Sequence, residues 1–208
     1  MSQIETSYKP KQERSRQARE SILLATLELL EVSGLEKIST NQIAKAAEVN
    51  IATLYKHFSD KYQILSELAR NFSKKQSDLI CTYLVNTPTS SSIKIVCDGL
   101  VDALTEGTKD DRALVQLQRA LIVFPELHEI YRRSNIEIGV AMKPFLCAWG
   151  INLNPQQLNV SMTCIGEAFG ALQDLALSDS STYNDEVINE LKLLLTGYYQ
   201  SRSKPSNS

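Results

Sequence analysis

Apolar residues recur along most of the chain at spacings of three or four, which is the repeat of an α-helix with one buried face. The pattern predicts helices over residues 16–32, 40–47, 51–58, 61–84, 93–105, 110–124, 127–149, 155–177 and 185–199. Pro125 should end or redirect the sixth of these helices, and Pro144 should kink or shorten the seventh. Because few segments alternate polar and apolar residues as strands do, we expect an all-α chain of about nine helices.

Capping residues mark where the second, third and fourth helices begin. Ser39 can form a capping box with the glutamine three residues later, although Thr40 would serve equally well as the N-cap. Asn50 can cap the third helix, and Ser59 or Asp60 can cap the fourth. Since only a three-residue turn separates the second helix from the third, the first three helices match the arrangement of a helix-turn-helix domain.

The charge of the chain is unevenly distributed. Its net charge of −2 does not by itself suggest a nucleic-acid partner. Five basic residues against the single acid Glu13 nevertheless give segment 9–19 a local charge of +4: Lys9, Lys11, Arg14, Arg16 and Arg19. A basic arm that leads into a helix can meet phosphates before the rest of a domain docks, although solvated basic tails are also common.

The composition favours a cytoplasmic protein. No apolar run approaches the roughly 18 residues that a membrane span needs, and segment 1–19 is too polar for a signal peptide. The cysteines are scattered, at Cys81, Cys97, Cys147 and Cys164. In a reducing cytosol such cysteines are usually small core residues, and a redox-sensing thiol is the alternative.

The sequence contains no arrangement of residues that indicates catalysis or metal binding. Its two histidines, His57 and His128, are both distant from any cysteine in the sequence, so we expect no metal site. A glycine-rich phosphate loop and a nucleophile elbow are both missing. We therefore expect a protein that is not an enzyme and that needs no cofactor.

The segment from Thr40 to Lys61 carries a specific motif. Its core is Ile43-Ala44, Val49, Thr53-Leu54-Tyr55, His57-Phe58 and Lys61. On these residues, the region from 16 to 71 closely resembles the helix-turn-helix DNA-binding domain of the TetR family of transcriptional regulators. The chain departs from the family pattern at Glu48, where many members have glycine. If this residue must adopt a positive φ, the cost is roughly 1 kcal/mol.

The resemblance implies that residues 51–58 form a recognition helix, whose N-terminal residues face the bases in the major groove. The candidates for base contact are Asn41, Ile51, Ala52 and Thr53. The candidates for phosphate contact are Arg16, Thr40, Tyr55, Lys56, His57 and Lys61. Taken alone, Tyr55 or His57 would more often be a packing residue, so these roles depend on the joint pattern.

The resemblance also implies the division of the chain. We expect a flexible basic arm over residues 1–15, the DNA-binding domain over 16–71, a helical effector-binding and dimerisation domain over 72–200, and a flexible tail over 201–208. Residues 119–127 are weakly similar to the corresponding stretch of regulators of multidrug efflux.

Candidate residues of the second domain are less specific than those of the first. Residues that combine apolar bulk with a polar group are pocket candidates: Gln116, Arg119, Tyr131, Met142, Trp149 and Met162. Residues on the last two long helices are candidates for the dimer interface: Gly166, Gly170, Leu191, Leu194, Leu195 and Tyr198. Packing inside one chain would explain both sets as well.

Together these expectations describe a homodimeric repressor of double-stranded operator DNA that is released by a small, largely hydrophobic effector. Effector binding would tilt the helix that joins the domains and disturb the spacing of about 34 Å between the two recognition helices. The alternative is a ligand-independent DNA-binding protein, architectural or controlled by a protein partner, whose second domain has a filled core.

Overall fold

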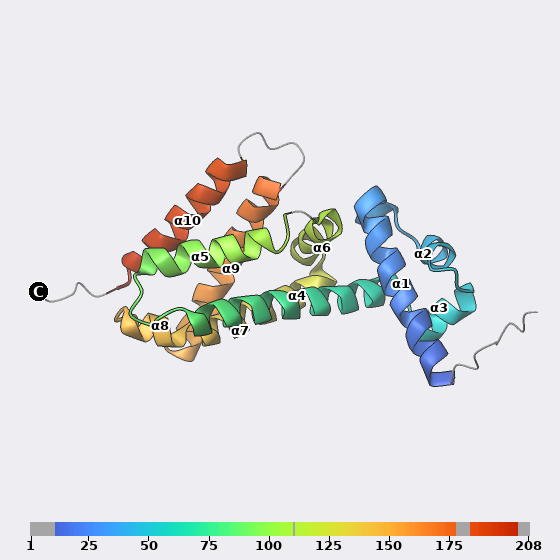
Figure 1. Cartoon of the computed structure of the whole chain (residues 1–208), viewed down its shortest axis with the longest axis horizontal. Helices are drawn as coiled ribbons and strands as arrows, with labels where there is room; N and C mark the ends of the chain where they lie inside the picture. Colours follow the sequence, from blue (N-terminus) through green and yellow to red (C-terminus); the bar gives the residue numbers. More distant parts are fainter. Residues whose placement is uncertain (1–10, 110, 178–183, 204–208) are drawn as a thin grey trace, which may run out of the picture. The chain divides into compact units, whose positions relative to one another are not determined.

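The computed structural model describes residues 11–109, 111–177 and 184–203, and these residues form helices and no strands (Figure 1). The helices are α1 (Lys11–Ser33), α2 (Thr40–Ala46), α3 (Ile51–His57), α4 (Lys61–Asn86), α5 (Ile93–Glu106), α6 (Arg112–Val123), α7 (Pro125–Ala141), α8 (Lys143–Ala148), α9 (Pro155–Leu177) and α10 (Asn184–Gln200), and a 3-10 helix, η1 (Leu35–Lys37), follows α1. The prediction of an all-α fold is confirmed. The described residues hold one α-helix more than expected, because the segment 127–149 divides at Met142, just before Pro144.

The chain divides into two compact units, and the boundary falls between Leu65 and Ser66, inside α4. The first unit contains α1, η1, α2, α3 and the first residues of α4. The second contains the rest of α4 and α5 to α10. The boundary expected after residue 71 lies further along the same helix.

The described ends of the chain are more helical than the sequence predicts. α1 begins at Lys11, so residues 11–15 of the expected arm are helical, and residues 201–203 follow α10 in a hydrogen-bonded turn. Glu13 lies in the first turn of α1, where a negative charge is favourable, and pairs with Arg16 one turn later. Residues 1–10 and 204–208 of the expected arm and tail lie outside the described residues.

In the first unit, α1, α2 and α3 pack on one another around a small apolar core. Ile22, Leu30, Ile43 and Leu54 have no exposed surface, and Phe58 is 1% exposed. Full burial of a side chain of this kind contributes roughly 1.5–3 kcal/mol. The apolar positions of the sequence therefore determine which faces of the two short helices turn inward, and hence which faces reach solvent.

Caps determine where the short helices begin. Ser39 is the N-cap of α2, and its amide donates to Oε1 of Gln42 at 2.9 Å while its hydroxyl accepts from the Gln42 amide at 3.3 Å. Asn50 caps α3 as predicted. At the start of α4, Asp60 rather than Ser59 accepts the hydrogen bond from the amide three residues later.

The turn between α2 and α3 contains a residue in an unfavourable conformation. Glu48 has a φ of 54°. Apart from glycines, no other residue in the described part of the chain has a positive φ. Hydrogen bonds hold the turn, since the Glu48 amide donates to the Lys45 carbonyl at 3.2 Å and the Val49 amide to the Ala44 carbonyl at 3.0 Å. Glu48 therefore occupies the left-handed conformation in which the Cβ approaches the following carbonyl.

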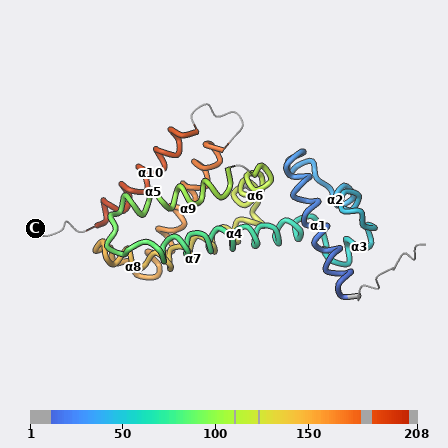
Figure 2. Tube along the Cα trace, in the orientation of Figure 1, coloured from blue at the N-terminus to red at the C-terminus, as the bar shows by residue number. Residues whose placement is uncertain are grey.

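In the second unit, α9 packs on α6, α7 and α10, and α10 also packs on α5. Figures 1 and 2 show α7 running beside the second-unit part of α4, where the hydroxyls of Ser77 and Ser134 are 3.1 Å apart. The core of this unit is built from aliphatic and aromatic side chains such as Val96, Phe145 and Leu191. Residues of this core line the cavity described below.

Glycines allow α7 and α9 to approach closely. A Cβ at Gly170 would lie 2.6 Å from the Tyr131 hydroxyl and 2.8 Å from Cδ1 of Ile122. A Cβ at Gly166 would collide with the amide of Asn135. The Tyr131 hydroxyl donates to the Gly166 carbonyl across this contact. Both glycines, predicted to lie in a dimer interface, are thus used for packing within one chain.

Replacing Glu48 with glycine should stabilise the protein. The left-handed conformation costs a residue with a Cβ about 1–2 kcal/mol, and the greater freedom of glycine in the unfolded chain offsets about 0.5–1 kcal/mol of that gain. We expect the free energy of unfolding, measured by urea denaturation, to rise by up to about 1 kcal/mol.

Two matched variants separate the backbone effect from loss of the charge. Glu48→Ala keeps the Cβ and should give no comparable gain. Ala46→Gly changes a helical residue of α2 and should lower stability by about 0.5–1 kcal/mol. A lower stability of Glu48→Gly than of the parent protein would contradict the strain at this turn.

Candidate nucleic-acid interface and ligand cavity

The first candidate site is the surface formed by α2 and α3. The hydroxyls of Thr40, at the start of α2, and Tyr55, in α3, share a hydrogen bond of 3.0 Å. Tyr55 is 51% exposed, so this bond lies at the surface. Each hydroxyl can donate as well as accept, and the pair can therefore bind one phosphate oxygen from two helices.

α3 presents small and basic side chains outward. Leu54 is fully buried and fixes the inward face of the helix, and α3 contains no acidic residue. The predicted contact residues that reach the surface of α2 and α3, fully or in part, are Asn41, Ile51, Ala52, Thr53, Lys56 and His57. Small side chains at Ala52 and Thr53 let a helix approach base edges, and Lys56 and His57 add basic groups in its last turn.

Lys61 makes a structural contact that its predicted role does not include. Its Nζ donates to the Ile38 carbonyl at 3.3 Å and lies 5.5 Å from the centroid of the Tyr62 ring. The bond ties the start of α4 to the segment that precedes α2. Because an ammonium group has three donors, this contact leaves donors for a phosphate.

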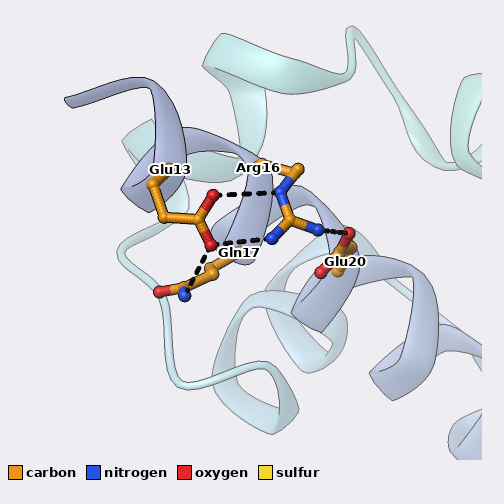
Figure 3. A network of polar contacts seen from close by, with 4 residues as sticks. All are labelled: Glu13, Arg16, Gln17 and Glu20. Atoms are coloured by element: carbon orange, nitrogen blue, oxygen red, sulfur yellow. Dashed lines mark hydrogen bonds and ion pairs between the residues drawn. The ribbon is translucent and has the colours of Figure 1, made fainter. Parts of the chain in front are cut away.

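Arg16 is held by neighbouring acids on α1 (Figure 3). Its guanidinium donates to Glu13 at 2.7 and 3.1 Å and to Glu20 at 2.7 Å. The hydrogen bond and charge of Glu13, followed by the charge of Glu20, raise the pKa of Arg16 above its ordinary value. Since the side chain is 60% exposed, a phosphate can reach it, but only by replacing carboxylate partners.

The second candidate site is a cavity of about 70 Å³ inside the second unit. Side chains of α4, α5, α7, α9 and α10 line it, and most of them are Leu, Ile, Met or Phe. Its polar members are Cys97, Asn135 and Tyr199. Burial raises the pKa of Cys97 to about 12 and raises the pKa of Tyr199 as well, so both groups stay uncharged.

Only part of the predicted pocket lines this cavity. Met142 and Met162 do, and the buried Tyr131 bonds to Gly166, which is itself a lining residue. The other three predicted residues, Gln116, Arg119 and Trp149, lie outside the lining. Arg119 instead pairs with Asp174 at 2.8 Å, and the Trp149 indole donates to the Ser91 carbonyl at 3.0 Å.

Asn135 is a functional candidate that the sequence analysis missed. An asparagine in the middle of a helix is usually assigned to the solvent-facing side. A signal for burial was present, because Tyr131, Asn135 and Ile138 recur at spacings of four and three along one face of α7, and the C-cap Met142 follows four residues later.

The last two helices expose an apolar surface, but on another face than predicted. On α9 the exposed small or apolar residues recur every three or four positions, and on α10 they cluster near its end: Val160, Cys164, Ala168, Ala171 and Leu175, then Leu193, Leu194 and Gly197. Of the predicted interface residues, Leu194 is exposed and Tyr198 half-buried. Gly166, Gly170, Leu191 and Leu195 are buried, because the most apolar face of each helix packs on its own core.

Two further sequence expectations concern cysteines and metals. The cysteines were expected to be small core residues. Cys97 is buried as expected and Cys81 is partly buried, whereas Cys147 and Cys164 are exposed, so the expectation is wrong for these two. Within the described part of the chain, no three His, Cys, Asp or Glu side chains gather as metal ligands would. The same residues contain no helix with the length and apolar character of a membrane span.

Comparison with known families identifies the first unit. The model of the tetR family of bacterial regulatory proteins matches residues 22–68, which begin in α1 and end in α4. Residues 22–68 of the chain are therefore a TetR-family DNA-binding domain. A comparison with curated proteins finds no match.

Solved structures, TetR-family repressors among them, share the fold of this chain over most of its length. FadR of Thermus thermophilus, in complex with lauroyl-CoA, is 18% identical with a TM-score of 0.65, covering 91% of this chain and 98% of that one. RolR, in complex with resorcinol, is 17% identical with a TM-score of 0.64, covering 95% and 100%. AlkX of Dietzia sp., implicated in biodegradation of n-alkanes, is 18% identical with a TM-score of 0.60, covering 89% and 97%.

Lys56→Ala and Lys61→Ala should have different effects on the TetR-type DNA-binding unit. Each removes one cation, so each should weaken DNA binding and reduce the slope of log K against log salt by about 1. Only Lys61→Ala should also lower the melting temperature, because only Lys61 donates to the Ile38 carbonyl. Filter binding over a range of salt concentrations and thermal denaturation measure the two effects.

Lys143→Ala provides a matched control, since Lys143 is an exposed lysine of the second unit. It should change neither the salt slope nor the melting temperature. Equal losses of thermal stability in Lys56→Ala and Lys61→Ala would contradict the structural role of Lys61.

Proposed function

We propose that this regulator is a homodimeric repressor that binds operator DNA through α2 and α3 and leaves it when a small, largely hydrophobic molecule binds the second unit. The Thr40–Tyr55 hydrogen bond carries the proposal, because it joins the two helices of the motif at an exposed surface where both hydroxyls can meet a phosphate. The neighbouring lysines and the open face of α3 support the same partner.

Sequence would be read by the first turn of α3. Ile51 and Ala52 can contact thymine methyl groups, and Thr53 can offer its hydroxyl to a base or a phosphate. Asn41 of α2 is exposed and has an amide suited to a base edge or to the backbone. Phosphate contacts by Thr40 and Tyr55 would fix the position of α3 in the groove.

The apolar surface of α9 and α10 supports dimerisation. A single α3 of seven residues offers few base contacts, whereas two half-sites one DNA turn apart double them. Val160 is 59% exposed and Leu194 57%, on helices that also bear exposed Ala168, Ala171 and Gly197. Small side chains along one helix face allow a second copy of α9 to approach closely.

The cavity supports control by an effector. It is apolar and has uncharged polar groups, which suits a small hydrophobic molecule. RolR and the Thermus thermophilus FadR, which share the fold, were solved with resorcinol and lauroyl-CoA. The ligand-independent alternative expects a filled core, and a cavity of about 70 Å³ weighs against it.

α4 provides a route from the effector to DNA. Ile80 of α4 lines the cavity, and the same helix begins at Lys61, a candidate phosphate contact. A ligand that favours one position of Ile80 therefore also favours one position of α4. For release, the ligand must bind the arrangement that cannot bind DNA more tightly than the arrangement that can. A ligand with equal affinity for both arrangements would not shift the equilibrium between them.

Operator binding is tested by mobility shift with DNA from around the regulator's own gene at two salt concentrations. Tyr55→Phe should weaken binding by about 10- to 150-fold, because it removes a hydroxyl that bonds to a charged phosphate. Tyr83→Phe is the matched control, since its hydroxyl donates to the Ile95 carbonyl in the second unit. A shift that is insensitive to sequence, to salt and to Tyr55→Phe would refute the DNA-binding surface.

Dimerisation is tested by placing charges on the exposed surface. Ala168→Glu and Leu194→Glu should each convert the dimer to a monomer in analytical ultracentrifugation while the circular dichroism spectrum stays helical, because a buried, unpaired carboxylate opposes association. Val85→Glu changes an exposed apolar residue of α4 outside this surface and should leave the dimer intact. Dimers of unchanged affinity in both α9 and α10 variants would place the interface elsewhere.

A further inference from the structure

One polar atom of the cavity lacks a partner. Nδ2 of Asn135 is buried and makes no hydrogen bond to any described residue. Asn135 lies on α7 among the apolar lining residues, and a Cβ at Gly166 would occupy the space of its amide. A buried donor without an acceptor is unfavourable, so a group that supplies the acceptor gains more than its own hydrogen bond.

No neighbouring group accepts a hydrogen bond of regular geometry from this amide. The Tyr131 hydroxyl donates to the Gly166 carbonyl. Burial raises the pKa of Tyr131 to about 12 although the nearby Asn135 side chain acts to lower it, so Tyr131 stays a neutral hydroxyl. The Tyr199 hydroxyl donates to the sulfur of Met142 at 3.8 Å. Both tyrosine protons are thus donated within the protein, and the Asn135 amide is the donor left for an acceptor on the ligand.

Charge and size restrict the ligand further. None of the lining residues is charged at neutral pH, so an ionic ligand would lose its hydration without gaining a counter-charge. An engineered protein cavity that binds benzene has a volume of about 150 Å³. The cavity of the second unit is smaller, at about 70 Å³. Met142 and Met162 line the cavity, and methionine side chains rearrange easily to enlarge such a space.

We propose that the cavity selects a small, uncharged, mostly apolar molecule that carries one acceptor oxygen, such as a ketone or ester carbonyl, and that Asn135 donates to this oxygen. This inference rests on the proposed function, because it names the chemical class of its effector. It makes Asn135 the residue that distinguishes an oxygenated ligand from a plain hydrocarbon of the same shape.

The test compares cyclopentanone with methylcyclopentane on the purified dimer without DNA. Ligand-observed NMR gives the two dissociation constants, and their ratio is measured in the parent protein and in Asn135→Leu. Leucine keeps the volume of the side chain and removes the donor, so the preference for the ketone should fall by about tenfold. Asn152→Leu, at an exposed position, should leave the ratio unchanged.

A second measurement does not depend on the variant folding. The side-chain amide signal of Asn135 in the parent protein should move on addition of cyclopentanone and not on addition of methylcyclopentane. Cyclopentanecarboxylate, which carries a charge on the same ring, should bind at least tenfold more weakly than the ketone.

Three outcomes would overturn the proposal. The ratio of the two dissociation constants could be the same in the parent protein and in Asn135→Leu, the amide signal of Asn135 could stay unchanged on addition of cyclopentanone, or none of the probes could bind. A water molecule that satisfies Asn135 would produce the first two of these results. Because binding is measured without DNA, such outcomes reject the ligand class while the mobility shift separately decides operator binding.

Discussion

The close contact between α7 and α9 is the constraint on which the second unit depends. Gly166 leaves room for the Asn135 amide, Gly170 for the Tyr131 ring, and Gly139 for the Met162 side chain. With a Cβ at any of these positions, a lining or neighbouring side chain would have to move. The same glycines therefore allow the helices to pack and preserve the space that the packing encloses.

Much of the fold was predictable because local signals coincide with packing. α2 and α3 begin where their caps predict, and the division at Met142 follows from Pro144. The start of α1 was not predicted, since its first residues have no apolar periodicity and are stabilised by charged neighbours such as Glu13. Periodicity detects helices that bury a face and misses turns that electrostatic pairs extend.

The two candidate sites differed in how far the sequence could define them. The α2–α3 surface is built from consecutive residues, so a motif with fixed spacing locates Thr40 and Tyr55 together. The cavity is built from five helices distant in sequence, and whether Asn135 faces inward depends on how all of them pack. Leu191 and Leu195 show the same limit, since an apolar stripe does not reveal whether it meets its own core or a second copy.

Under the proposed function, the ion pairs around Arg16 would make its contact with DNA depend on docking. A passing phosphate must compete with Glu13 and Glu20, each only 2.7 Å away, and two carboxylates already satisfy the guanidinium. A phosphate that docking holds beside α1 competes at a far higher effective concentration. In the proposed complex, Arg16 would contribute little to loose encounters and would bind a phosphate only after docking, so it would lengthen the lifetime of correct complexes without strengthening sliding or other non-specific contacts.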